Sequence, residues 1–121
     1  MSNVAIPSEE WKEFLDAFSE RHRGRLVRIE IHDMQTEENV DSEFMRLNSI
    51  ELDTEDPGNS RINVTVELDR KEIKHVLFRP SRVTMQMSES TPEESLNVQS
   101  LHTSTTLRFR AAVSGEATSV A

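Results

Sequence analysis

The chain has 121 residues, of which 35% are hydrophobic and 30% charged, and 14 Lys+Arg against 22 Asp+Glu give it a formal net charge of −8. It contains no cysteine, which excludes disulfides, thiol catalysis and thiolate metal sites, and no apolar run reaches the roughly 18 residues of a membrane span. The acidic balance argues against general nucleic-acid binding, because affinity for phosphate backbones rests on clustered cations. Its first residues show no secretory leader pattern, so we expect a cytoplasmic protein.

The first predicted element is an amphipathic helix that begins at Ser8, a residue type favoured at N-caps, and ends before Gly24. The basic run at residues 21–23 suits the negative end of the helix dipole, and Gly24 suits the left-handed conformation that ends many helices. Apolar residues recur at i, i+3, i+4 and i+7 and form one stripe, which consists of Trp11, Phe14, Leu15 and Phe18. We expect this stripe to face the core.

After Gly24 the apolar period changes from 3.6 to two, which predicts half-buried strands. The most regular strands cover residues 27–32, 61–68, 82–87 and 105–111, and less regular strands are expected near 43–52, 72–79 and 94–101. The apolar phase of the 43–52 segment changes between Leu47 and Ile50, which predicts a β-bulge near Asn48 and Ser49.

These elements predict a single α+β domain over residues 1–113, followed by a flexible tail at 114–121. No second helical pattern is present to serve as a parallel crossover, so the sheet must be antiparallel. The expected architecture is an N-terminal amphipathic helix packed on a six- to seven-stranded antiparallel sheet, which forms either a small barrel or a two-layer sandwich.

Negative charge is concentrated between residues 30 and 56, where ten acids face a single Arg46 and the segment carries −9. The commoner explanation of such a segment is a pair of solvated connecting loops. The functional alternative is an acidic face that attracts a protein partner with a basic surface.

The chain contains four histidines, and their spacing matches no zinc motif: His22, His32, His75 and His102. We expect His22 to cap the helix, His32 to face solvent, His75 to pack at a strand edge and His102 to lie in a hairpin turn. Glycines are too few for a nucleophile elbow, a phosphate loop or a dinucleotide fingerprint. The sequence therefore predicts no metal site and no cofactor, and an enzyme is improbable.

The order of several short segments resembles a family of small bacterial proteins catalogued only as a domain of unknown function. The segments that carry this resemblance are Ile6-Pro7, Trp11, Phe14, Phe18-Ser-Glu-Arg-His-Arg-Gly24, His75, Pro80-Ser-Arg-Val83, Leu96-Asn-Val-Gln-Ser100 and Thr105-Thr-Leu-Arg-Phe-Arg110. The resemblance implies a bacterial single-domain protein and supplies no catalytic residues. It also points to the shared residues that packing does not obviously demand, which are His22, His75, Arg82, Arg108 and Arg110.

Three functions remain open at this point. The leading hypothesis is a non-enzymatic binding or protein-interaction module with an acidic face, which binds neither nucleic acid nor membrane. The second is a small-molecule carrier with an apolar interior lined by Trp11, Phe18, Met85, Met87 and Phe109. The third is an enzyme that uses His22 or His75 with Arg108 or Arg110 as an anion clamp.

Overall fold

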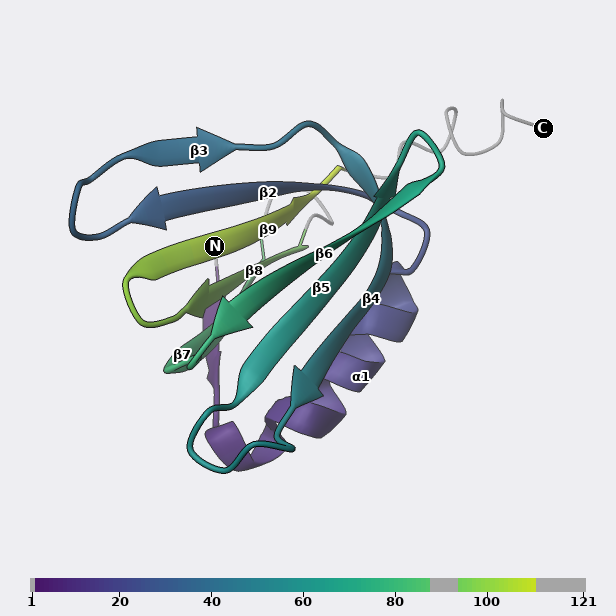
Figure 1. The fold of residues 1–121 in the computed structure, drawn as a ribbon. Helices are drawn as coiled ribbons and strands as arrows, with labels where there is room; N and C mark the ends of the chain where they lie inside the picture. Colours follow the sequence, from purple (N-terminus) through teal and green to yellow (C-terminus); the bar gives the residue numbers. More distant parts are fainter. Residues whose placement is uncertain (1, 88–93, 111–121) are drawn as a thin grey trace.

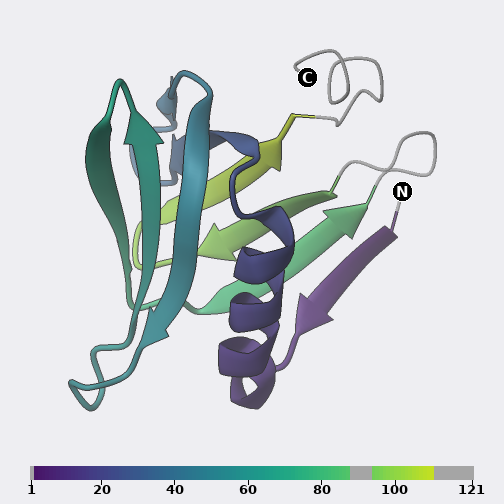
Figure 2. The same cartoon turned by 90° about the vertical axis from the view of Figure 1, so that its right-hand side faces the viewer.

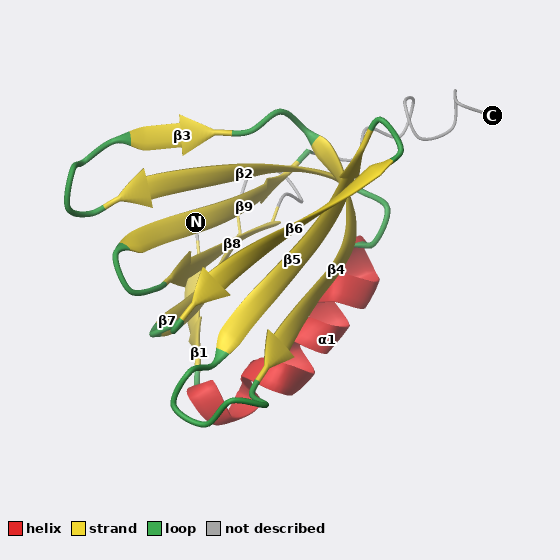
Figure 3. Cartoon of the chain, viewed as in Figure 1, coloured by secondary structure: helices red, strands yellow, loops and turns green. Residues whose placement is uncertain are grey.

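The computed structural model describes residues 2–87 and 94–110, which form one short helix and nine strands (Figure 1). The elements follow in the order β1 (Ser2–Ile6), a 3-10 turn η1 (Ser8–Glu10), α1 (Trp11–His22), β2 (Leu26–Asp33), β3 (Asn39–Asp41), β4 (Met45–Asp53), β5 (Arg61–Leu68), β6 (Lys71–Phe78), β7 (Arg82–Met87), β8 (Glu94–Gln99) and β9 (Thr103–Phe109). Figure 3 shows how strongly strands outweigh helix. The predicted α+β class is confirmed, and the predicted tail at 114–121 lies outside the described residues.

All nine strands belong to one antiparallel sheet with the order β1-β7-β8-β9-β2-β4-β5-β6, and β3 pairs with β2 away from this path. Of the two predicted closures, a small barrel or a two-layer sandwich, the barrel is wrong, because β1 and β6 are free ends of the sheet. The predicted count of six to seven strands is also wrong, since β1 and β3 were missed. The first is five residues long, and the second has three residues that are all exposed, so neither gives a clear alternation.

The sheet bends sharply where β2 meets β4. Only two residue pairs join these strands, Leu26 with Arg46 and Val27 with Met45. From this corner the rest of β2 continues along β9 and β3, whereas β4 turns away with β5 and β6, so the sheet has two limbs that fan apart (Figure 1). Helix α1 lies between the limbs on the side of β4 and β1 (Figure 2).

The core lies between the two limbs and the helix. Trp11, Leu15 and Phe18 are buried on the inward side of α1, and Phe14 is partly buried against the same cluster, so the predicted stripe is confirmed. Both limbs add inward-facing residues at every second position, among them Val64 from β5. This packing fixes the positions of the strands of the two limbs relative to each other.

Two local predictions have different outcomes. The β-bulge is confirmed, because the register of β4 on β5 shifts between Leu47 and Ser49. The start of the helix is wrong by one turn, since Ser8 lies in the 3-10 turn, makes no capping hydrogen bond, and α1 begins at Trp11. At the other end Gly24 has φ 86°, the left-handed conformation expected there.

Candidate functional site

A groove opens between the free strand β6 and the opposite limb, where β2, β3 and β9 lie. It comprises two cavities of about 350 Å³ and about 460 Å³. Both are lined by Ile31 of β2 and His75 of β6, so they adjoin at these two residues. We call the smaller one the hydroxyl cavity, the larger one the acidic cavity, and the two together the β6 groove. Each volume lies in the range of small-molecule and side-chain pockets.

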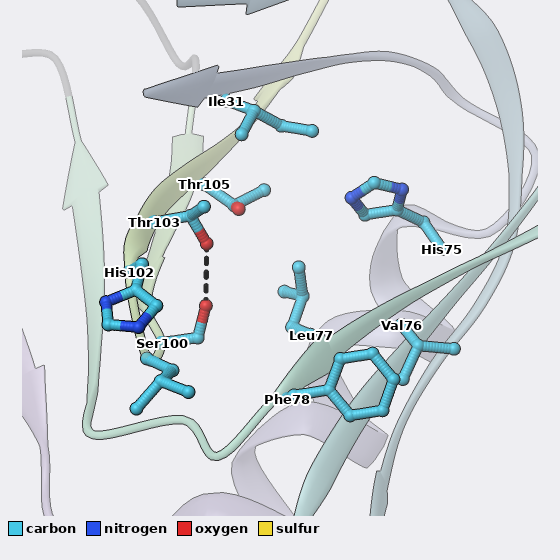
Figure 4. Close-up of a pocket in the computed structure, with 10 residues that line it drawn as sticks. Ile31, His75, Val76, Leu77, Phe78, Ser100, His102, Thr103 and Thr105 are labelled. Carbon is cyan, nitrogen blue, oxygen red and sulfur yellow. Dashed lines mark hydrogen bonds between the residues drawn. The ribbon is translucent and has the colours of Figure 1, made fainter. Parts of the chain in front are cut away.

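The hydroxyl cavity has a polar wall on β9 and an apolar wall on β6 (Figure 4). On the polar wall, the Ser100 and Thr103 hydroxyl oxygens are 2.8 Å apart in a hydrogen bond. Next to them Thr105 is fully buried, and its Oγ1 has no hydrogen-bond partner among the described residues. Across the cavity lie Leu77 and His75. A buried hydroxyl with no partner is costly, so Thr105 is a candidate for hydrogen bonding to a group placed in this cavity.

The acidic cavity is lined by residues from β2, β3, β4, β5 and β6 together with the segment between β3 and β4. Its charged lining residues are Asp41 and Glu43, and no lysine or arginine is among the residues that line it. The remaining wall is largely apolar and includes Val40 and Ile73. This cavity therefore suits a group with an apolar stem and a positive end.

His75 points inward from β6 between Ile73 and Leu77, on the face of β6 that also packs on the core. It is half-buried, and burial lowers the pKa of its imidazole below the ordinary value of 6.5. No described residue forms a hydrogen bond with this imidazole. His75 is therefore neutral near physiological pH and offers one donor and one acceptor to the groove.

The other predicted histidines lie elsewhere. His22 is 1% exposed and packs between Phe18 and Phe109, with ring centroids at 4.4 Å and 4.3 Å, so the expectation that it caps the helix is wrong. His22 follows Phe18 by four residues and therefore lies on the same apolar stripe of the helix, so its ring packs in the core. His32 Nδ1 lies 2.7 Å from Asn39 Oδ1 on the opposite face of β2 from Ile31, and His102 is exposed in the turn before β9, as expected.

The three predicted arginines do not join His75. Arg108 lies on the outward face of β9, where its Nε donates to Glu30 Oε2 over 3.1 Å, and Arg28 Nε is 3.3 Å from the same oxygen. Arg82 is exposed at the start of β7, and Arg110 follows β9 and accepts a hydrogen bond from Arg25 through its backbone oxygen. Arg108 and His75 are thus on different faces of the molecule, and no described contact joins them.

The acidic segment is also divided by the fold. Its first part forms β2, β3 and the connections around them, beside the acidic cavity. By contrast, Asp53 ends β4, and Glu55 and Asp56 belong to the β4–β5 loop at another end of the molecule (Figure 1). Only the first part borders the groove. Over the described ranges, no group of three or more His, Asp or Glu residues is arranged to hold a metal ion. No helix in the described part is long and apolar enough to cross a membrane.

Sequence reasoning missed three features of the β6 groove. The alternation puts Thr105 in phase with Leu107 and Phe109, and a hydroxyl in this otherwise apolar register is the signal that indicates it. Ile73 and Phe78 were assigned to an irregular strand, and nothing local shows that this strand ends the sheet. The five residues expected to line an apolar interior do not line the groove, because Trp11, Phe18 and Phe109 belong to the packed core.

Comparison with known proteins shows the fold and the family. The YojF protein of Bacillus subtilis has a solved structure that matches with a TM-score of 0.51 and 13% sequence identity, over 93% of this chain and 99% of that chain. At this identity the likeness shows the fold alone. A search of curated proteins finds no match. The description "Family of unknown function (DUF5335)" belongs to a family model that matches residues 2–118, which confirms the resemblance read from the sequence, and the chain therefore belongs to the DUF5335 family.

Proposed function

We propose that this protein is a non-enzymatic interaction module of the bacterial cytoplasm, which holds a basic segment of a partner protein in the β6 groove. The observation that carries the proposal is the distribution of exposed apolar side chains. Of the seven large hydrophobic residues exposed in the described part, four border the groove, namely Val40, Ile73, Phe78 and Leu101, and of these Phe78 has its ring on the same face of β6 as Val76, beside Arg61. Apolar side chains gathered around a concave surface are typical of binding sites.

Charge supports a basic partner. Asp41 and Glu43 line the acidic cavity, and Glu37 and Glu38 precede β3 in the adjoining connection. The nearest imidazole in the cavity, that of His75, is neutral because burial lowers its pKa. Asp41 pairs with Glu30 on the face of the sheet opposite to Ile31 and Val40, so it borders the cavity through its backbone, and Glu43 is the acidic side chain that remains. A Lys or Arg side chain placed here meets Glu43 and an apolar wall, which favours both its charge and its stem.

The chemistry of the groove supports binding rather than catalysis. A general base is normally oriented by a hydrogen bond to a third group and placed beside a nucleophile. His75 has no such partner among the described residues, and the nearby hydroxyls of Ser100 and Thr103 bond to one another. These groups are suited to donate and accept hydrogen bonds to a ligand.

The test is to select peptides from a random display library on the immobilised protein and to measure their affinity by fluorescence anisotropy. We expect the selected peptides to carry Lys or Arg, and their affinity to fall with rising salt and in the Asp41→Asn, Glu43→Gln double variant. Ile73→Ser should weaken binding roughly tenfold. The matched control is Val4→Ser on β1, because Val4 is 46% exposed and Ile73 42%, and Val4 does not line the groove.

Equal loss in Ile73→Ser and Val4→Ser would show that the groove is not the binding surface. Affinity that does not change between low and high salt would remove the acidic residues from the mechanism. A library that yields no peptide sensitive to the groove substitutions would refute the proposal as a whole.

A small-molecule carrier is the second candidate, and Thr105 is the observation that favours it. Its buried Oγ1 has no partner in the described part, so a ligand atom in the hydroxyl cavity supplies the missing hydrogen bond. Thermal-shift measurements with fatty acids, haem and flavins test this function. A stabilising ligand should lose its effect in Thr105→Val, and the absence of any stabilising compound in these classes would end this candidate.

A further inference from the structure

The hairpin between β5 and β6 determines which backbone groups of β6 are free. Its turn has two residues, Asp69 and Arg70, with φ of 52° and 66°, which are the conformations of a type I′ turn. Leu68 and Lys71 close this turn as Cα partners. In a two-residue hairpin the closing pair exchanges both backbone hydrogen bonds, and every second pair beyond it does the same.

The far end of the hairpin follows the same alternation of hydrogen-bonded and non-hydrogen-bonded pairs. Arg79 N donates to Ser60 O over 2.9 Å, which is the position where a hydrogen-bonded pair falls if Leu68 and Lys71 form the first one. The residues that bond to β5 are therefore the odd-numbered ones, Lys71, Ile73, His75 and Leu77. The N–H and C=O groups of Glu72, Lys74 and Val76 point to the free edge of β6.

This free edge faces the β6 groove. Val76 lines the hydroxyl cavity although its side chain lies on the opposite face from Leu77, so the backbone edge itself borders the cavity. Phe78, the next even-numbered residue, accepts a hydrogen bond through its O from Leu101 N over 3.4 Å. A segment of the opposite limb thus already bonds to the edge of β6 at one end, and the positions beyond it are free in the described structure.

We propose that the partner segment binds in extended conformation as an additional strand on the edge of β6, and this rests on the function proposed above. Its backbone bonds to Glu72, Lys74 and Val76, and it continues the contact that Leu101 makes with Phe78. Strand addition of this kind derives affinity from main-chain hydrogen bonds and specificity from pockets for alternate side chains.

The two cavities specify the side chains of the added strand. Inward-facing residues of a strand are about 7 Å apart, and the two cavities adjoin at His75 with Ile73 on one side and Leu77 on the other. A Lys or Arg enters the acidic cavity beside Glu43. A side chain two residues away enters the hydroxyl cavity, where a hydroxyl or amide group bonds to Thr105 Oγ1 and to the imidazole of His75. The partner is therefore an extended basic segment with a hydrogen-bonding residue at the i±2 position.

The decisive experiment compares proline with alanine at Val76, with the peptides selected from the display library as probes. Val76→Pro removes one free N–H and leaves the hydrogen bonds to β5 in place, because proline is tolerated at the solvent side of an edge strand. Val76→Ala removes the same side chain and keeps the N–H. We expect Val76→Pro to weaken binding at least about tenfold and Val76→Ala about twofold or less. Lys74→Pro and Lys74→Ala provide a second matched pair.

Hydrogen exchange of the unmodified protein provides a second test, which does not depend on correct folding of the proline variants. Binding should slow hydrogen exchange of the Glu72, Lys74 and Val76 amides and leave those of Ile73 and His75 unchanged, since the latter already bond to β5. N-methylation of every second residue of the peptide should abolish binding when the methylated residues are those whose N–H groups bond to β6. Methylation of the residues between them should leave binding intact.

The outcomes separate this inference from the proposed function. Equal effects of proline and alanine, or no change in amide exchange on β6, would overturn strand addition, while sensitivity to Ile73→Ser would keep the groove as the binding surface. If neither Val76→Pro nor Ile73→Ser changed the affinity, both strand addition and binding in the β6 groove would be refuted. Self-association of the protein that disappears in Val76→Pro would identify a second copy of this chain as the occupant and overturn the assignment of a basic partner.

Discussion

Arg25 Nη1 lies 3.0 Å from Nδ1 of His22, and its Nη2 donates to the backbone oxygen of Arg110 over 2.9 Å. Because a guanidinium only donates hydrogen bonds, Nδ1 is the acceptor and the proton of the neutral ring is on Nε2. The guanidinium carbon is also 5.9 Å from the centre of the Phe109 ring. One side chain thus ties together the end of α1, the start of β2 and the end of β9.

The first prediction concerns this buried ring. His22→Ala should lower the free energy of unfolding by about 3 kcal/mol, because it leaves a cavity between Phe18 and Phe109 and removes the acceptor for Arg25. Urea denaturation measures the change. His22→Phe keeps the ring stack and should lose less. A loss below about 1 kcal/mol in the alanine variant would show that the ring is not part of the core.

The second prediction concerns the contact between α1 and β4. Ile50 N donates to Ser19 Oγ over 2.9 Å, and Ser19 is buried. Ser19→Ala leaves this amide without a partner, so stability should fall by about 1–3 kcal/mol in urea denaturation. Asp16→Ala on the exposed face of the same helix is the control, with an expected change within about 0.5 kcal/mol.

The third prediction is a pH dependence that comes from His75. Burial lowers the pKa of its folded state below the 6.5 of the free side chain, so between these values the unfolded chain binds a proton that the folded chain does not. The free energy of unfolding should therefore decrease as the pH falls below about 6.5, and level off below the folded pKa. Urea denaturation across this range in wild type and His75→Gln measures it. Identical pH profiles for the two proteins would contradict the shift.

The fourth prediction concerns the β5–β6 turn, where Asp69 and Arg70 have φ of 52° and 66°. Left-handed backbone is unfavourable for residues with a side chain and least so for Asn and Gly. Asp69→Asn with Arg70→Gly should raise the free energy of unfolding by about 1 kcal/mol, as measured by thermal and urea denaturation. Lys71→Gly, one residue inside β6, should instead lower it by about 0.5–1 kcal/mol. Destabilisation by the turn substitutions would argue against a type I′ turn.

The fifth prediction separates stability from binding at Thr105. Thr105→Val replaces a buried hydroxyl without a partner in the described part by a methyl group, so stability should rise by about 1 kcal/mol while affinity for the selected peptides falls. Thermal denaturation and fluorescence anisotropy give the two values. In the control Thr106→Val the hydroxyl that accepts from Asn97 is lost, and stability should fall. If Thr105→Val proved less stable than the wild type, the hydroxyl would have a partner within the fold.

The sequence pattern predicted the structural features that depend on residues close together in the chain. Alternation located the long strands, and the phase change after Leu47 located the bulge, because both follow from which side chains face the core. The burial of His22 was available in the same way, since it continues the stripe of Leu15 and Phe18, but its position at the helix end suggested a cap instead.

Features that depend on distant segments were not predictable. The β6 groove exists because β2 leaves β4 after two residue pairs and continues along β9, so that β6 remains an edge. Alternation in β6 is the same whether the strand has one neighbour or two. For that reason the sequence indicated His75 as a candidate but did not show its position beside Thr105, which is thirty residues later in the chain and belongs to the other limb.

The order of strands in the sheet also determines when the chain can fold during synthesis. Val27 pairs with Phe109, and β1 pairs with β7, so β1 and β2 wait for these partners until late in translation. The β4–β5–β6 meander has only local pairings and can form on the ribosome first. A nascent chain that stops before β9 leaves the apolar side of β2 uncovered, which makes this intermediate a substrate for chaperones and a source of aggregation at high expression.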